Sequence, residues 1–148
     1  MADSAREQLA RDIDVIEGAY EFFLAYAAQG LSREVQGARV ETQFRGHLAA
    51  TLNAVSRLAD LLARLIEEEQ PASRAQLEAF RTVVQADAQR ASATLSLVQA
   101  QPIATSQLVD NLNASVHVRT LLTDLFVLDE VLDLGVQALA PEVGESIP

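Results

Sequence analysis

Apolar residues recur at spacings of three and four along almost the whole chain, which is the period of an α-helix that buries one face. The first stretch of this kind carries Leu9, Ile13, Ile16, Tyr20 and Phe23. Three further stretches repeat the pattern, and only a few residues separate each from the next. The sequence therefore predicts an all-α protein.

Glycine, proline and serine residues at the ends of these stretches define four predicted helices. They run from Ser4 to Gly30, from just after Ser32 to about Glu69, from Ser73 to about Ala100, and from Thr105 or Ser106 to about Ala140. The first and third open with capping-box sequences, Ser4-Ala5-Arg6-Glu7 and Ser73-Arg74-Ala75-Gln76. Short connections favour antiparallel neighbours, so we expect an up-down four-helix bundle of unequal helices over residues 1–140 and a polar tail at 141–148.

Four of the seven aromatic residues gather in the segment AYEFFLAYAAQG, residues 19–30. The first predicted helix thus carries a second apolar stripe beside its core stripe. At ~1.5 Å per residue, the third helix ends roughly 15 Å short of the turn between the first two. This predicts a protruding helix 1–2 hairpin with an exposed apolar tip. The alternative is that the second helix breaks near Gly37 or Gly46 and folds back over the tip.

The fourth predicted helix changes its polar side part-way along. Asp110, Asn113 and His117 are polar in its first half, whereas Asp129 and Glu130 occupy nearly the opposite side in its second half. One straight helix on one core cannot bury both apolar faces. We expect either a kink near Val116–Thr120 or a second half that packs on a partner.

Surplus apolar surface of this kind is typical of a partner surface. The sequence therefore predicts a non-catalytic interaction module, such as a small accessory, adaptor or assembly subunit, that forms a homodimer or binds a protein partner. The predicted interface lies on the first helix and the second half of the fourth. Its residues are Val15, Phe22, Phe23, Tyr26, Leu31, Phe126, Val127 and Leu134.

Composition and charge exclude several functional classes. The chain of 148 residues has no cysteine and no lysine, which excludes disulfides, a cysteine nucleophile and a Schiff-base lysine. A net charge of −10 disfavours nucleic-acid binding. No apolar run is long enough to span a membrane and the N-terminus does not resemble a secretory signal, so we expect a cytoplasmic protein.

The charges are also unevenly distributed along the chain. Residues 91–109 contain no charged side chain, whereas acidic residues gather where the second helix and the fourth helix end. We interpret the acidic end as a solvated surface. The alternative is a docking site for a basic partner or a divalent cation.

Two histidines are the main candidates for chemistry. Neither His47 nor His117 has a glutamate three residues before it, so we expect no carboxylate-bridged metal site, no cofactor and no enzyme activity. An exposed His47 would allow histidine phosphotransfer, a second hypothesis. A third is an apolar small ligand in a cavity beside the small residues of the third helix. His117, Asp110 and Asp124 are interpreted as a polar surface stripe.

Overall fold

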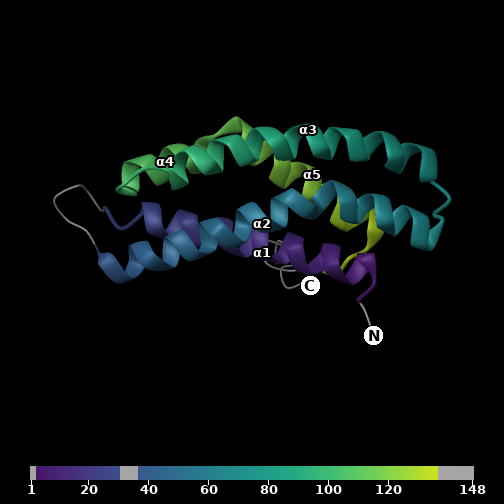
Figure 1. The fold of residues 1–148 in the computed structure, drawn as a ribbon, viewed down its shortest axis with the longest axis horizontal. Helices are drawn as coiled ribbons and strands as arrows, with labels where there is room; N and C mark the ends of the chain where they lie inside the picture. Colours follow the sequence, from purple (N-terminus) through teal and green to yellow (C-terminus); the bar gives the residue numbers. More distant parts are fainter. Residues whose placement is uncertain (1–2, 31–36, 137–148) are drawn as a thin grey trace, which may run out of the picture.

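The computed structural model describes residues 3–30 and 37–136. Its helices are α1 (Ala5–Ala27), α2 (Ala38–Glu69), α3 (Arg74–Gln99), α4 (Ser106–Ala114) and α5 (Val116–Leu132). The described residues contain no strand, so the all-α prediction is confirmed. Figure 1 shows an elongated molecule in which α2 and α3 run side by side. α1 packs on α2 and α4, and α3 packs on α2 and α5. The predicted tail at 141–148 lies outside the described residues.

The first capping box forms as predicted. The Ser4 hydroxyl accepts a hydrogen bond from the Glu7 backbone N–H at 3.1 Å, and the Glu7 carboxylate accepts one from the Ser4 N–H at 3.0 Å. The second does not form, because Ser73 has φ −92° and ψ 33°, outside the extended region that a capping side chain needs. Thr105 instead caps α4 by accepting a hydrogen bond from the Leu108 N–H.

The fourth predicted helix is two helices. Ser115 has an extended ψ of 126° and separates α4 from α5, one residue before the range in which the sequence predicted a kink. Because of this break, α4 and α5 can each bury their own apolar face. This explains why the polar residues lie on different sides in the two halves of the predicted helix. The chain also leaves the helical path earlier than Ala140, because Asp133 and Gly135 adopt positive φ values of 52° and 77°.

The aromatic end of α1 is covered by the chain that follows α3. Tyr26 lies under the connection between α3 and α4, and its hydroxyl donates to the Ala104 carbonyl at 2.6 Å. The side-chain amide of Asn113 donates to the Phe23 carbonyl at 3.1 Å, so α4 is tied to the same end of α1. The prediction of an exposed tip at the end of α1 was based on helix lengths alone. Such lengths do not include the connection at residues 100–105, which covers Tyr26.

The second helix also extends less far beyond the third than the sequence predicted. α2 begins at Ala38 rather than just after Ser32, and it continues without a break through Gly46. Arg45 donates to the carbonyls of Gln99 and Gln101, each at 2.7 Å, and this ties α2 to the end of α3. The alternative of a break at Gly46 is therefore wrong, whereas the chain that would fold back before Gly37 lies outside the described residues. The aromatics are covered by Phe44 of α2, by α4 and by the connection that precedes α4.

Candidate functional site

The structure separates the predicted interface residues into interior and surface positions. Phe23 and Tyr26 are only 2% and 1% exposed, because both rings pack on Phe44 of α2 with centroid distances of 5.2 and 4.8 Å. Their prediction as surface residues is corrected: they are core residues. Val15, Phe126 and Val127 are exposed, Phe22 and Leu134 are half-buried, and Leu31 lies outside the described residues.

The exposed large apolar side chains are concentrated on two helices. In the described part of the chain, α2 has none and α1 has two, Val15 and Leu24. These two are nine residues apart, which at 100° per residue places them on opposite sides of α1. The other six lie on α3 and α5: Val83, Leu97, Val116, Phe126, Val127 and Val131. The aromatic helix therefore presents less apolar surface than the sequence indicated, and α5 presents more.

One exposed face of α5, called here the α5 outer face, combines apolar residues with charges at its two ends. It consists of Val116, Arg119, Thr123, Phe126, Val127 and Glu130, all of them exposed. Arg119 and Glu130 are eleven residues apart, which is three turns with an offset of only ~20°. Neither side chain forms an ion pair or a hydrogen bond with another described residue. The face thus carries two charges that have no partner in the described chain.

An open groove of about 500 Å³ lies at the elbow between α3 and α4, called here the α3–α4 groove. Most of its lining residues belong to the charge-free stretch 91–109, and Asn111 and Leu112 follow just beyond it. Neutral residues line it throughout: Thr94, Leu97, Val98, Gln101, Pro102, Ile103, Thr105, Leu108, Asn111 and Leu112. Sequence reasoning missed this groove, although the absence of charge from residue 91 to residue 109 was its signal.

A cavity among the described interior residues is much smaller than this groove. Where the small residues of α3 face α1, the cavity beside Tyr20, Phe23 and Ala91 has a volume of about 20 Å³. That is close to the space one water molecule needs and far below the 300 Å³ or more of a small-ligand site. Phe23 and the leucines of α5 line this cavity, which is too small to hold such a ligand. The hypothesis that the bundle binds an apolar small ligand stays a prediction.

A pair of carboxyl groups lies between α3 and α5. Asp124 is 8% exposed, and its Oδ2 atom has no hydrogen-bond partner among the described residues. Burial, and then the neighbouring carboxyl of Asp87, raise the pKa of Asp124 to about 7. Arg90 reaches Asp87 from the solvent side at 3.3 Å. The prediction that Asp124 belongs to a surface stripe with Asp110 and His117 is thus corrected: Asp124 is buried, and the helix is broken at Ser115.

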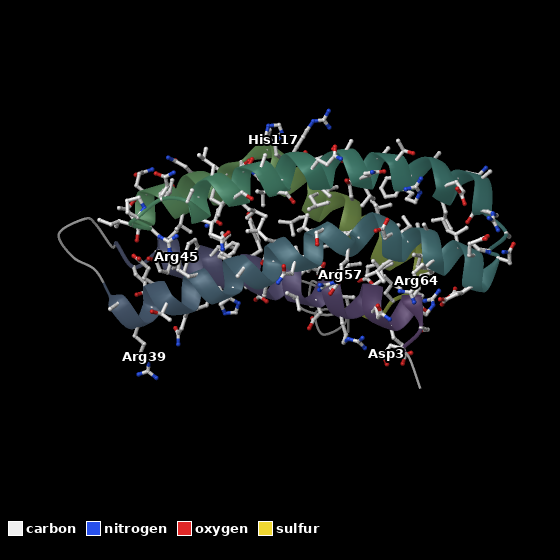
Figure 2. The ribbon with its side chains drawn as sticks, viewed as in Figure 1. Asp3, Arg39, Arg45, Arg57, Arg64 and His117 are labelled. Atoms are coloured by element: carbon white, nitrogen blue, oxygen red, sulfur yellow. The ribbon has the colours of Figure 1, made fainter. Side chains whose placement is uncertain are left out.

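The two histidines differ in their surroundings. The His47 ring is exposed and stacks on Phe22 with a centroid distance of 4.3 Å. Exposure is what the phosphotransfer hypothesis requires, but no charged side chain contacts this ring in the described structure, and the hypothesis remains a prediction. His117 points away from the helices in Figure 2.

Arginines occupy the acidic end of the molecule. Each glutamate at the end of α2 meets one: Glu67 meets Arg74 at 2.8 Å, Glu68 meets Arg64 at 3.6 Å, and Glu69 meets Arg6 at 2.8 Å. Nearer the middle of the molecule, where Figure 2 labels Arg57, this arginine donates two hydrogen bonds of 2.8 Å to the Asp12 carboxylate. The pairs of Glu69, Glu67 and Asp12 link α2 to α1 or α3, whereas the Glu68–Arg64 pair lies within α2. Three of these carboxylates thus take part in contacts between helices. The described residues include no group of acidic or histidine side chains suited to hold a metal ion.

Comparison with protein-family models, with curated proteins and with solved structures gave no match for this chain. Among the helices that the structure describes, none is both long and apolar enough to cross a membrane.

Proposed function

We propose that this protein is a non-catalytic association module that forms a homodimer through the α5 outer face. The observation that carries the proposal is the exposure of Phe126 and Val127, 41% and 46%, in the middle of a face whose ends carry opposite charges. Aromatic and aliphatic residues surrounded by polar ones are typical of association surfaces.

The arrangement of charge favours a second copy of the same chain as the partner. In a twofold dimer the same surface of both copies forms the interface. Each contact between residue i of one copy and residue j of the other therefore occurs twice, once on each side of the axis. Two antiparallel α5 helices would place Arg119 of one copy opposite Glu130 of the other, and the same pair would form again across the axis. Thr123, Phe126 and Val127 would lie between the two pairs. This arrangement would also supply partners for both charges.

The proposed interface is smaller than the one that the sequence predicted. The second half of the fourth predicted helix keeps its role, as α5, whereas α1, whose Phe22 stacks on His47 of α2, is not part of the proposed surface. We also propose that α4 and α5 together act as the fourth member of an up-down bundle, and that the dimer serves as a cytoplasmic accessory or adaptor subunit.

Size-exclusion chromatography with light scattering, across a concentration series, tests the dimer. We expect a mass of twice the 16.0 kDa of one chain, and we expect Val127→Glu to give a monomer. Leu24→Glu is the matched control, because Leu24 has the same 46% exposure but lies on α1. A monomeric parent protein would contradict the proposal, as would a dimer that Leu24→Glu dissociates and Val127→Glu does not.

Charge reversal tests the antiparallel arrangement. Arg119→Glu or Glu130→Arg alone would replace two attractive contacts with two repulsive ones and weaken the dimer about tenfold, since an exposed pair contributes roughly 0.2–1 kcal/mol. The double variant would restore both pairs and should dimerise as the parent does. Additive weakening in the double variant would show that these residues do not face each other.

A further inference from the structure

The α3–α4 groove differs from the rest of the surface in its lack of charge. A chain with net charge −10 has here an open hollow of about 500 Å³ that neutral residues line throughout. This volume lies within the range of small-molecule sites, which are concave and mostly apolar with a few polar groups that orient the ligand. The groove shares no lining residue with the α5 outer face, so binding there is independent of the proposed dimer.

Apolar side chains supply most of the groove surface. Leu97 is 66% exposed at its rim, and Ile103 and Leu108 are half-buried along it. Burying such side chains against an apolar body is favourable by about 25 cal/mol for each Å² removed from water. The occupant therefore needs an apolar body.

Three polar side chains in the groove still have unused hydrogen-bonding capacity. The amide of Gln101 donates to the Leu97 carbonyl, and its side-chain oxygen accepts no bond from the described residues. The Thr105 hydroxyl accepts from the Leu108 N–H, and its own hydrogen has no acceptor there. Asn111 accepts from Gln107 through its oxygen and keeps its amide hydrogens. These groups can bind a hydroxyl, a carbonyl or an amide.

The same groups cannot compensate a charge. Removing an ionised carboxylate or ammonium from water is costly unless an opposite charge pairs with it, and no residue of the groove is ionised. The net negative charge of the chain also repels anions over longer distances. We propose that the α3–α4 groove binds a neutral amphiphile, a molecule with an apolar body and one uncharged polar group.

Fluorescence of N-phenyl-1-naphthylamine, a neutral apolar dye that brightens in apolar sites, tests the groove on the full chain. We expect saturable binding, and we expect 1-decanol to displace the dye at a concentration at least tenfold lower than decanoate or decylammonium. No saturable binding, or equal displacement by decanol and decanoate, would overturn the proposal.

Paired variants locate the site. Leu97→Glu places a carboxylate at the rim and should weaken dye binding at least tenfold, whereas Leu97→Met should bind as the parent does. Val83→Glu is the control on the same helix, because Val83 is also exposed but does not line the groove. Leu97 is largely exposed, so these changes leave the core intact, and circular dichroism verifies this. Equal losses in Leu97→Glu and Val83→Glu would refute the assignment.

Two further measurements exclude other occupants of the groove. If Leu97→Glu dissociates a dimer that Val127→Glu leaves intact, a second copy occupies the groove and the proposal is wrong. If the parent protein sediments with phosphatidylcholine vesicles, its rim inserts into a bilayer and the proposal is again wrong. Failure of the α5 dimer with intact dye binding would overturn only the proposed function.

Discussion

Replacement of Asp124 with asparagine tests whether the carboxyl pair between α3 and α5 opposes folding at neutral pH. Asp124 is buried beside Asp87, so above neutral pH two negative charges share one poorly hydrated site. Asparagine has nearly the same shape, carries no charge and can donate its amide hydrogen to the Asp87 carboxylate. The substitution therefore removes the repulsion and keeps the packing.

The size and sign of the effect follow from the pKa of Asp124. Its value rises from 3.8 to about 7 on folding, a difference of about three pH units. Each unit corresponds to ~1.4 kcal/mol, which sets an upper limit of about 4 kcal/mol. Between these two values the folded state holds a proton that the unfolded state has released. The unfolding free energy of the parent protein therefore falls as pH rises from about 4 to about 7.

Urea unfolding followed by circular dichroism at pH 5 and at pH 8 provides the assay. We expect Asp124→Asn to be more stable than the parent by about 1–3 kcal/mol at pH 8, and we expect the gain to shrink at pH 5. Asp60→Asn is the control, since Asp60 is exposed and loses the same charge. A variant that is less stable at pH 8, or a gain that does not depend on pH, would refute the reasoning.

Two other substitutions probe the fold. Tyr26→Phe removes the buried hydrogen bond to the Ala104 carbonyl, so it should lower the unfolding free energy by about 1–2 kcal/mol in the same urea assay. An unchanged unfolding free energy would mean that this bond does not hold the α3–α4 connection on α1. Gly46→Ala lies inside α2 with open space around the added methyl group, so it should raise stability by roughly 0.5–1 kcal/mol, and a loss would contradict the continuity of α2 there.

Sequence reasoning was most accurate where the cause is local. The Ser4 capping box forms because both of its hydrogen bonds join residues three positions apart. A kink near Val116–Thr120 was one of two alternatives that the sequence left open, and the break lies one residue before that range, at Ser115. Its signal is local, because the side of the polar residues changes along the chain itself. The capping prediction at Ser73 was wrong although the residue types were right, since the turn after α2 holds Ser73 outside the extended conformation.

The candidate surfaces were less predictable, because they depend on contacts between distant segments. Phe23 and Tyr26 were predicted at the surface, but Tyr26 bonds to the α3–α4 connection and Phe23 to Asn113 of α4, at sequence separations of 78 and 90 residues. Asp124 was predicted to be a surface carboxylate, but in the structure α5 packs this residue against Asp87 of α3. A helical wheel reports which residues share a side, but it does not report which sides other segments cover.

By itself the sequence determined that the chain is helical, roughly where its helices begin and end, and that residues 91–109 carry no charge. Periodicity, caps and composition are properties of neighbouring residues, so they can be read in one dimension. Only the tertiary structure decided that Phe23 and Tyr26 belong to the core, that Asp87 meets Asp124, and that the exposed large apolar residues of the described chain lie mainly on α3 and α5. The reason is physical: burial is set by which residues from distant segments pack together, and a linear pattern does not specify those partners.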